Sequence, residues 1–435
     1  MLNSMKKIHF IGIGGIGVSA LAGYYLKKGV EISGSDVAKS PITEKLKKGG
    51  AKIFIGHRAF NLASDVELVI YTAAATKDNP EIKEAKNKKI KTQSYAEALG
   101  DLTKEMHTIA VSGMHGKSTI TAMIGLIMEK AGLDPTVIIG TKVKEWGNNN
   151  FRIGKSKYLV IEADEYNASF LNYWPKIIVL TNIEEEHLDF YKGGIKQIAK
   201  TFSDYAGHLG SWGTLVAYAQ DEEIIKIAKK SEAKVVLFDI SEESSKEEKL
   251  DLKLPGAHNL SNALAALAVA EVLKISDKIV RKTLSEFNGT WRRMEYKGKI
   301  NGAKIYDDYA HHPTEIKATL AGAKEMVKED GQLWCVFQPH QYQRTYKLFK
   351  QFSEAFFSAD KTIILPIYSV AGREKQSIKK MVSSKKLVKK INDEKVIYLD
   401  SFSKAGKYLR KNLKKGDLCI IMGAGDIYQL TAKLF

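Results

Sequence analysis

Short apolar segments alternate with amphipathic segments along most of the chain. Each apolar stretch of a few residues is followed by a glycine or polar turn, and then by apolar positions at helical spacing. Three such series begin afresh, with apolar stretches at 8–11, 108–111 and 303–306. Because strands that alternate with helices form parallel sheets covered by helices, this pattern predicts an α/β protein.

Polar connectors precede the second and the third series, at 100–104 and 296–299. A chain of 435 residues is also longer than one hydrophobic core usually organises. We therefore predict three domains, at residues 1–103, 104–294 and 295–435, each of a size at which a domain can fold.

The composition limits the class of protein. With 44% hydrophobic and 27% charged residues, the chain is expected to fold rather than to be disordered. No apolar run reaches the roughly 18 residues that a membrane span requires, so we predict no membrane insertion. The two cysteines, Cys335 and Cys419, fall in apolar segments and are expected to be free thiols. Together with a start that lacks a signal-peptide pattern, they predict a cytoplasmic protein.

The net charge of +17 would permit a polyanionic partner. The densest lysine clusters, at 379–390 and 404–415, have helical spacing and are interpreted as solvated helix faces. They lack the interleaved aromatic pattern that single-strand binding requires, so we predict no nucleic-acid partner. The oligomeric state cannot be predicted from these features.

A glycine-rich loop follows the first apolar segment. Residues Gly12 to Gly17 have the G-x-G-x-x-G spacing, a helical pattern follows at 16–28, and Asp36 ends the next apolar segment. Glycines let a diphosphate approach the backbone at a helix N-terminus, and the acid can bind a ribose hydroxyl. The pattern predicts NAD or another nucleotide diphosphate; a tight turn without a ligand is the alternative.

A second glycine loop follows the apolar segment at 108–111 and opens a helical pattern at 119–131. It is shorter than the usual phosphate-binding loop, because its first glycine is Gly113. Lys117 can still reach the outer phosphates of ATP, and the Ser118 hydroxyl can bind Mg²⁺. The predicted ATP-binding residues are Gly113, Met114, His115, Gly116, Lys117, Ser118 and Thr119.

Acidic residues follow two later apolar segments. The first segment ends in Glu162, Ala163, Asp164 and Glu165, and the second leads to His187. Ligands bind at the carboxyl ends of parallel strands, so one of these acids could hold the metal that bridges ATP phosphates. His187 would belong to the same site unless it is an ordinary surface or core residue.

Asn259 and Asn262 lie three residues apart, where an alanine-rich helical pattern begins. Two carboxamides on one face of a first turn could recognise the edge of a base. Helix capping is the alternative explanation for one of them.

Taken together, these motifs resemble those of the Mur ligases, over nearly the whole chain. Besides the two loops, the resemblance rests on the segments 33–36, 162–165, 181–184, 258–262, 292–293, 307–315 and 337–340. It implies an N-terminal Rossmann-like domain for a UDP-sugar, a central P-loop ATPase-like domain with a parallel sheet, and a C-terminal Rossmann-like domain for an amino acid. The first loop would then bind the diphosphate of UDP and not NAD.

The resemblance also implies roles for individual residues. The UDP-sugar would be bound by Gly14, Gly15, Ile16, Gly17, Asp36 and His57. The catalytic residues would be Lys117, Glu162, His187 and Arg293. The ligands of Mg²⁺ would be Ser118, Glu162 and His187. The rest of ATP would be bound by Asn259, Asn262, Arg293 and Asp308. The incoming amino acid would be bound by His311, His312, His340 and Arg344.

The implied reaction is the ATP-dependent addition of L-alanine to the lactyl carboxylate of UDP-N-acetylmuramate through an acyl phosphate, in peptidoglycan precursor synthesis. One departure concerns the amino-acid site, since Gln341 stands where the family commonly has arginine, which leaves more of that duty to Arg344 or to a nearby lysine. Three alternatives stay open: a family member that adds an intact tripeptide, an NAD-dependent oxidoreductase, and an ATPase acting on nucleic acid.

Overall fold

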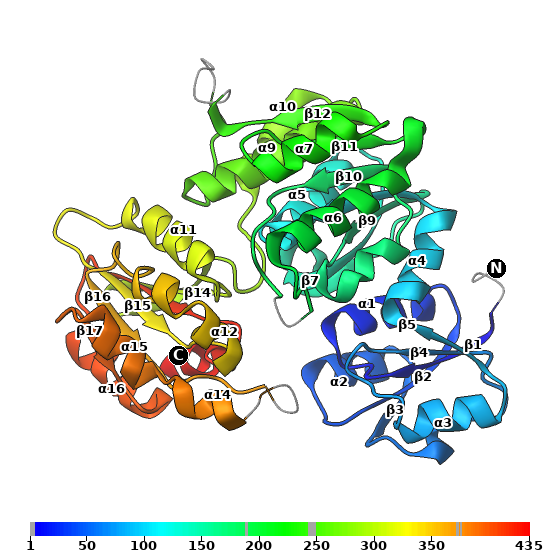
Figure 1. Ribbon diagram of the computed structural model, residues 1–435, viewed down its shortest axis with the longest axis horizontal. Coiled ribbons are helices and arrows are strands. Elements are labelled where there is room, and N and C mark those ends of the chain that lie inside the picture. The colour runs from blue at the N-terminus through cyan, green and yellow to red at the C-terminus, as the bar shows by residue number, and fades with distance from the viewer. Residues whose placement is uncertain (1–4, 188–189, 242–248, 371–373, 375) are drawn as a thin grey trace. The chain divides into compact units, whose positions relative to one another are not determined.

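The computed structural model of the chain describes residues 5–187, 190–241, 249–370, 374 and 376–435. It forms two compact units (Figure 1). Unit 1 comprises Met1–Asp251 and Ser261–Glu286, and unit 2 comprises Leu252–Leu260 and Phe287–Phe435. Residues 1–4, part of the start that lacks a signal-peptide pattern, lie outside the described residues.

The first sheet of unit 1 has five parallel strands in the order β3-β2-β1-β4-β5. Its elements are β1 (Lys7–Ile11), α1 (Ile16–Lys27), β2 (Glu31–Asp36), α2 (Pro41–Lys48), β3 (Lys52–Ile55), η2 (Ala59–Asn61), β4 (Leu68–Tyr71), α3 (Pro80–Asn87), β5 (Lys91–Ser94) and α4 (Tyr95–Glu105). The chain runs outward from β1 to β3 and then resumes at β4, on the other side of β1. The first glycine loop follows β1 and therefore lies at the topological switch point, where such sheets bind ligands.

The second sheet of unit 1 has seven strands in the order β12-β11-β10-β6-β9-β7-β8, and only β8 is antiparallel to its neighbour. Its elements are β6 (His107–Ser112), α5 (Lys117–Lys130), β7 (Thr136–Val143), η3 (Lys144–Trp146), β8 (Asn149–Arg152), β9 (Tyr158–Glu162), η4 (Tyr166–Asn172), β10 (Ile177–Leu180), α6 (Gly194–Ala206), η5 (Gly207–Trp212), β11 (Thr214–Tyr218), α7 (Glu222–Lys230), β12 (Lys234–Phe238), α9 (Ala257–Val272) and α10 (Asp277–Glu286). Since β6 lies between β9 and β10, the loop after β6 is flanked by the segments that follow those two strands.

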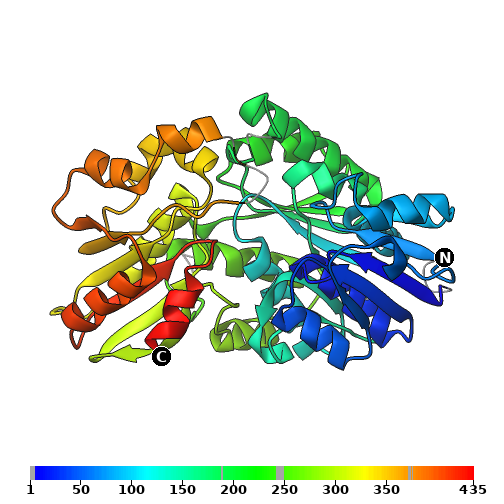
Figure 2. The same cartoon turned by 90° about the horizontal axis from the view of Figure 1, so that it is seen from below.

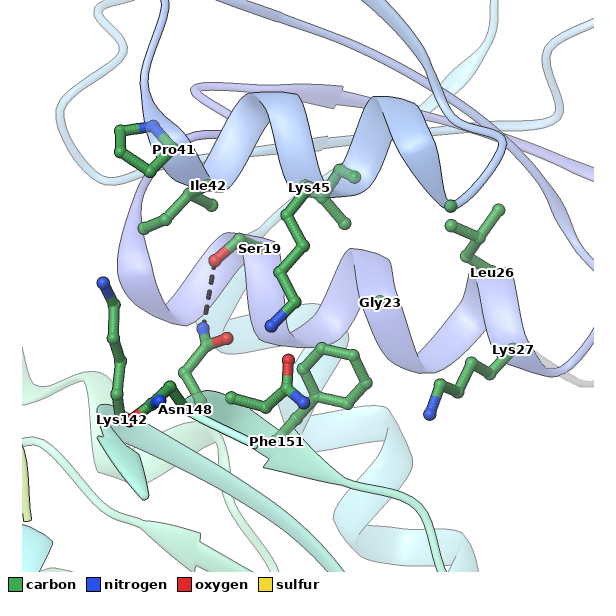
Figure 3. Close-up of a pocket in the computed structure, with 14 residues that line it drawn as sticks. Ser19, Gly23, Leu26, Lys27, Pro41, Ile42, Lys45, Lys142, Asn148 and Phe151 are labelled. Atoms are coloured by element: carbon green, nitrogen blue, oxygen red, sulfur yellow. Dashed lines mark hydrogen bonds between the residues drawn. The ribbon is translucent and has the colours of Figure 1, made fainter. Parts of the chain in front are cut away.

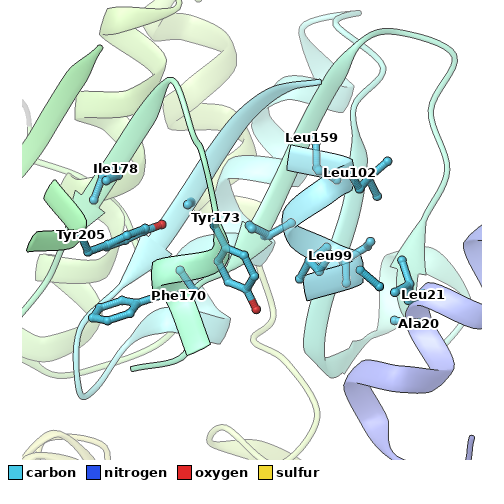
Figure 4. Packing of buried hydrophobic residues seen from close by; sticks show 14 of the residues in the cluster. Ala20, Leu21, Leu99, Leu102, Leu159, Phe170, Tyr173, Ile178 and Tyr205 are labelled. Carbon is cyan, nitrogen blue, oxygen red and sulfur yellow. The ribbon is translucent and has the colours of Figure 1, made fainter. Parts of the chain in front are cut away.

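One buried apolar cluster extends across both sheets of unit 1 (Figure 4). Leu21 of α1 belongs to it, as do Leu99 and Leu102 of α4 and Leu159 of β9. Helix α4 thus packs into the core that joins the two sheets. The predicted boundary at residue 103 falls inside this helix, and the positions of the two domain boundaries stay predictions.

Unit 2 contains one sheet of six strands in the order β13-β14-β18-β15-β16-β17, parallel except for β13. Its elements are β13 (Glu295–Ile300), β14 (Ala303–Asp308), α11 (Pro313–Lys324), β15 (Leu333–Phe337), α12 (Tyr342–Lys347), α13 (Phe349–Ser353), β16 (Lys361–Ile364), α14 (Gln376–Met381), α15 (Ser384–Ile391), β17 (Val396–Tyr398), α16 (Phe402–Asn412), β18 (Leu418–Met422) and α17 (Tyr428–Leu434). The last helix, α17, packs against α16 (Figure 2). With three sheets dominated by parallel strands, the predicted α/β fold class is confirmed.

Both cysteines are buried free thiols, in agreement with the prediction. Cys335 lies on β15 and Cys419 on β18, and burial raises the pKa of both thiols. Within the described residues, none of the helices combines the length and the apolar character that a membrane crossing requires.

Candidate active site

The first glycine loop is held by backbone and side-chain contacts from the end of β2. The N–H groups of Gly12 and Ile13 donate to the carbonyl oxygen of Ser35, and the Gly14 N–H donates to Oδ2 of Asp36 over 2.8 Å. A Cβ atom on Gly14 would lie 2.8 Å from that carboxylate oxygen, so glycine is needed for this approach. Asp36 therefore shapes the loop directly, in addition to the ribose contact predicted for it.

Beside this loop, a fully buried carboxylate holds His57 in place. Glu81 accepts hydrogen bonds from Ser35 Oγ and Asn61 Nδ2, both at 2.5 Å, and the Ser35 hydroxyl lies 2.9 Å from Nδ1 of His57. Nε2 of His9 lies 3.6 Å from the Glu81 carboxylate. Burial acts to raise the pKa of Glu81, but the hydrogen bonds from His9, Ser35 and Asn61 lower it to about 2. Our sequence prediction missed Glu81, because it resembles an ordinary acid in the first turn of a helix.

The second glycine loop adopts a conformation that only glycine accommodates at two positions. Gly113 has a φ of +137° and Gly116 a φ of +86°. A Cβ atom on Gly113 would lie 2.0 Å from Oγ1 of Thr181, and one on Gly116 would lie 2.4 Å from Oδ1 of Asn262. The loop thus brings the backbone against the segment after β10 and against Asn262 of α9, one of the two predicted carboxamides.

Two polar residues after β10 fix the path of this loop. The Thr181 hydroxyl donates to the carbonyl oxygen of His115 over 2.8 Å, and Oδ1 of Asn182 accepts from the His115 N–H over 2.8 Å. The Met114 N–H donates to the carbonyl oxygen of Asn182. With these two N–H groups engaged, the first turn of α5 offers donors for a phosphate, because its N–H groups have no partner within the helix.

Lys117, the first residue of α5, forms a buried ion pair with Glu165. Its ammonium nitrogen lies 2.7 Å from Oε2 of Glu165 and donates to the carbonyl oxygen of Gly113 over 2.6 Å. The other carboxylate oxygen, Oε1, lies 3.0 Å from Nε2 of His187. The predicted residues Lys117 and His187 are therefore brought together by Glu165, one of the acids that the sequence left as candidates for the metal site, although the resemblance named Glu162.

The charges of this trio perturb each other's titration. Burial acts to raise the pKa of Glu165, but Lys117 and His187 hold it below the usual range. Burial acts to lower the pKa of Lys117, but Glu165 and Asp164 raise it. The pKa of His187 is also raised, since its contact with Glu165 outweighs burial. Lys117 and Glu165 are therefore both stabilised in their charged forms at neutral pH.

Asp164, Glu165 and His187 each offer a ligand atom, and these atoms lie within 4.8 Å of one another. Carboxylate oxygens are the protein ligands that Mg²⁺ prefers, so the two acids of this donor set fit a divalent cation of that kind. Glu162 ends β9, and its carboxylate lies beside Gly140. The predicted metal-binding roles of Ser118 and Glu162 stay predictions.

In unit 2, two adjacent arginines differ in their surroundings. Arg292 is buried, its Nε donates to Oδ1 of Asp307 over 3.0 Å, and its terminal nitrogens donate to the carbonyl oxygens of Gly423 and Gly425. Arg293 is more exposed, and one terminal nitrogen lies 3.5 Å from the Glu315 carboxylate. Arg292 therefore organises the interior of unit 2, and Arg293 remains the arginine that can reach a ligand.

Asp308, predicted to bind ATP, is buried at the end of β14. Its carboxylate accepts from the Met294 N–H over 2.7 Å and from the Ala310 N–H over 2.8 Å. Burial raises the pKa of Asp308 to about 6, against the lowering effect of Arg293. In this conformation the carboxylate binds the backbone just before β13 and just after β14.

The predicted amino-acid site is brought together in part. The rings of His311 and His340 lie 6.0 Å apart, and a terminal nitrogen of Arg344 lies 3.2 Å from Nδ1 of His340. His340 stacks on Tyr368, with 5.4 Å between ring centroids. His311, His340 and Arg344 therefore share one region of unit 2.

His312 and Gln341 have local structural tasks nearby. His312 is buried at the N-cap of α11, where its side chain accepts from the Thr314 N–H. Gln341 has a φ of +72°, and its backbone N–H donates to the carbonyl oxygen of Tyr368. The residue that replaces the expected arginine thus forms the N-cap of α12.

The two predicted carboxamides lie near the start of α9 but in different compact units. Nδ2 of Asn259 donates to the carbonyl oxygen of Pro255 over 2.8 Å, which ties the first turn of the helix to the preceding segment. Asn262 lies against Gly116, as described above. Their predicted role in binding the adenine base stays a prediction.

Comparisons with known proteins agree with this geometry. Residues 7–107 match the Mur ligase family catalytic domain, residues 111–270 the Mur ligase middle domain, and residues 292–425 the Mur ligase glutamate ligase domain. A UDP-N-acetylmuramate–L-alanine ligase of Clostridium tetani is 43% identical over 98% of this chain and 97% of its own length. The corresponding protein of Acetivibrio thermocellus is 42% identical over 98% of this chain and 95% of its own length.

Solved structures show the same similarity. The UDP-N-acetylmuramate-alanine ligase of Thermotoga maritima matches with a TM-score of 0.81 and 28% identity, covering 98% of each chain. A murein peptide ligase of Psychrobacter arcticus matches with a TM-score of 0.72 and 25% identity, covering 99% of this chain and 98% of its own.

Proposed function

Because this chain belongs to the Mur ligase family, we propose that it joins L-alanine to the lactyl carboxylate of UDP-N-acetylmuramate at the expense of ATP. The structural observation that carries this proposal is the pair of phosphate-binding loops in unit 1, which follow β1 and β6. One loop suits the diphosphate of a UDP-sugar and the other suits ATP. The relatives supply the identity of the sugar and of the amino acid.

The reaction proceeds in two steps. A carboxylate oxygen of the lactyl group attacks the γ-phosphorus of ATP, the bond to the bridging oxygen breaks, and ADP leaves. The amine of L-alanine then attacks the acyl carbon, loses a proton, and inorganic phosphate leaves. In the first step two anions, the lactyl carboxylate and ATP, must approach each other, and in the second step the anionic acyl phosphate must be held for the amine. Positioning and charge neutralisation should therefore dominate catalysis.

Lys117 is the residue best placed to neutralise the outer phosphates. It extends from the first turn of α5, next to the loop, and its pKa is raised, so it stays protonated throughout the neutral range. Its contacts with Glu165 and with the Gly113 carbonyl keep the ammonium at the loop before ATP arrives. Phosphate oxygens would then join or replace Glu165 as its partners.

Asp164, Glu165 and His187 would hold Mg²⁺ together with the predicted ligands Ser118 and Glu162. When bound, the cation would withdraw charge from the phosphate oxygens during transfer. Glu165 would orient both its neighbours in this arrangement, since it contacts Lys117 through one oxygen and His187 through the other.

The amino acid would bind in unit 2, at the cluster of His311, His340 and Arg344. The carboxylate of L-alanine calls for a cation with paired N–H donors, which a guanidinium provides. Arg344 is the arginine of this cluster, and its contact with Nδ1 of His340 restricts its orientation. Arg293 would add positive charge to the transferring phosphoryl group.

A phosphate-release assay with UDP-N-acetylmuramate, ATP and a panel of acceptors tests the proposal. The panel should contain L-alanine, glycine, L-serine and the tripeptide L-alanyl-γ-D-glutamyl-diaminopimelate. We expect turnover with L-alanine that depends on both the sugar nucleotide and ATP. Turnover with the tripeptide and none with L-alanine would contradict the proposal and favour a tripeptide-adding ligase. The similar murein peptide ligase of Psychrobacter arcticus is the comparison protein for that alternative.

Two further assays separate the remaining alternatives. NADH binding without UDP-sugar binding would favour an oxidoreductase, and ATP hydrolysis stimulated by DNA or RNA would favour a nucleic-acid-dependent ATPase. We expect neither. The use of ATP is consistent with the proposed cytoplasmic location.

A further inference from the structure

A cavity of about 460 Å³ opens in unit 1 beside helices α1 and α2 and the β7–β8 hairpin (Figure 3). Ser19 and Gly23 line it from α1, Lys45 lines it from α2, and Lys142 and Phe151 line it from the hairpin. Its volume lies within the range of small-molecule sites. Because these elements belong to the compact unit that shares one apolar core, the cavity has a defined shape.

Three lysines from three elements line this cavity, which we call the lysine cavity: Lys27 of α1, Lys45 of α2 and Lys142 of β7. None of the residues that line it is acidic. Burial and the neighbouring charges of Lys142 and Lys27 lower the pKa of Lys45. Like charges collected around one space repel one another, and an anion that entered would relieve that repulsion.

The cavity also has an apolar wall. The Phe151 ring approaches α1 so closely that a Cβ atom on Gly23 would lie 2.5 Å from it. Leu26, Ile42 and Leu46 line the same space. The ammonium of Lys27 lies 5.7 Å from the centre of the Phe151 ring, so a charged and an aromatic group stand side by side. A ligand that combines an apolar body with negative charge matches both features.

The lysine cavity is distinct from the two phosphate sites. The residues that line it include neither Gly14, Asp36 and His57 of the first loop nor any residue of the second loop. It does adjoin the first loop, since Nδ2 of Asn150 donates to Ser19 Oγ over 3.0 Å and to the carbonyl oxygen of Ile16.

We propose that the lysine cavity is a third anion-binding site, for a small organic molecule that carries two or more negative charges on an apolar body. This inference goes beyond the ligation reaction and does not depend on it. The three ammonium groups would bind the charged part of the ligand, and Phe151 with the aliphatic side chains would pack against the apolar part.

The test is calorimetric titration of the full chain with 1-naphthyl phosphate, which is a dianion on an aromatic body near pH 7.5. UDP and a non-hydrolysable ATP analogue should be present at saturating concentration, so that the two phosphate sites are blocked. We expect one molecule to bind per chain. Inorganic phosphate and 1-naphthol, which each carry half of the required chemistry, should bind more weakly.

Variants assign the binding to the cavity. Lys45→Gln should weaken the affinity by about tenfold, as expected for the loss of one charge contact near a protein surface. The matched control is Lys48→Gln, an exposed lysine of the same helix that does not line the cavity, and it should change the affinity by less than about twofold. Phe151→Leu should weaken 1-naphthyl phosphate more than inorganic phosphate.

Three results would overturn the proposal. The first is no binding once the phosphate sites are blocked. The second is an equal effect of Lys45→Gln and Lys48→Gln. The third is equal affinity for inorganic phosphate and 1-naphthyl phosphate, which would remove the apolar part of the assignment. Circular dichroism of each variant shows whether unit 1 is still folded.

Discussion

The ammonium of Lys117 lies 2.7 Å from the carboxylate of Glu165. The two residues come from different segments, since one begins α5 and the other follows β9. Glu165 is only 1% exposed at its side chain, so this ion pair is shielded from water and is stronger than a surface pair. The pair holds the positive charge at the mouth of the phosphate loop, where the γ-phosphate of ATP would lie.

Replacing Glu165 by Gln should keep the shape of this site and remove its charge. Lys117 and His187 then lose the negative charge that they share. The proposed metal ligand also changes from a carboxylate to a neutral carboxamide, which binds Mg²⁺ more weakly. We expect the turnover number to fall by about 100-fold, the scale on which oriented electrostatic contacts act. The Mg²⁺ concentration for half-maximal rate should also rise, and phosphate release at varied Mg²⁺ measures both. Glu222→Gln, at an exposed position, is the control and should leave both values unchanged.

Replacing Lys117 by Ala should abolish phosphate release, because no other group of α5 supplies a charge at its first turn. Binding of UDP-N-acetylmuramate should be largely spared, since the first glycine loop follows a different strand. Phosphate release and calorimetric titration with the sugar nucleotide measure the two effects. Lys130→Ala, at the opposite end of the same helix, is the matched control. Normal turnover of Lys117→Ala would refute the assignment of the ATP site.

The two loops could be predicted from the sequence because their requirements are local. Positions 113 and 116 have a positive φ and closely approach neighbouring atoms. Both features favour glycine, so the glycines in the sequence indicate them. Strands and helices could be predicted as well, because their apolar positions repeat at short intervals. The α/β class followed from both.

The partners of these loops could not be predicted in the same way. Glu162 ends β9 while Asp164 and Glu165 follow it, and the turn after β9 decides which of these acids meets Lys117. Glu81 contacts Ser35 across 46 positions of the chain, so only the folded sheet brings the two together.

The adjacent arginines show the same limit. Arg292 and Arg293 are chemically identical in the sequence, and burial against Asp307 distinguishes them only in the fold. Contacts between distant segments depend on sheet order, and apolar periodicity does not specify that order.

Replacing Glu81 by Gln should weaken the UDP-sugar site. The variant removes the negative charge that holds Ser35 and His57, so the KM for UDP-N-acetylmuramate should rise by about tenfold, the effect typical of residues that orient a ligand group. The KM for ATP should stay the same. Glu84→Gln on the same helix, whose wild-type side chain pairs with Lys88, is the control. An equal rise in both KM values would contradict a specific role in the first site.

The same residue gives a pH prediction. Hydrogen bonding lowers the pKa of Glu81 from its usual 4.5 to about 2 in the folded protein. A group with a lowered folded pKa stabilises the fold above its unfolded pKa, and that contribution is lost as the pH falls through the window from 4.5 to about 2. Urea unfolding between pH 5 and pH 3 should therefore show a steeper loss of stability in the wild type than in Glu81→Gln. Parallel curves would contradict the prediction.

Asp308→Asn should destabilise unit 2. Both carboxylate oxygens of Asp308 accept backbone N–H groups, from Met294 and Ala310, and a carboxamide can accept only one of them. The other buried N–H then faces the NH₂ group of the carboxamide and loses its acceptor. This loss lowers the free energy of unfolding by about 1–3 kcal/mol. Urea titration measures this difference, with the exposed Asp330→Asn as the control. Equal stability of the two variants would contradict the role given to these hydrogen bonds.

Arg344 should determine the affinity for the amino acid. Arg344→Gln removes the guanidinium that would bind the carboxylate of L-alanine, so the KM for L-alanine should rise by about 10- to 100-fold, the range of a lost charged hydrogen-bond pair. The KM values for ATP and for the sugar nucleotide should change by less than about twofold, because neither phosphate loop contains this residue. Arg344→Lys should recover only part of the loss, since an ammonium lacks the paired N–H donors. Lys347→Gln, an exposed cation of the same helix, is the matched control. If Lys347→Gln raised the KM for L-alanine and Arg344→Gln did not, the cation that compensates for the missing arginine at position 341 would be Lys347 and not Arg344.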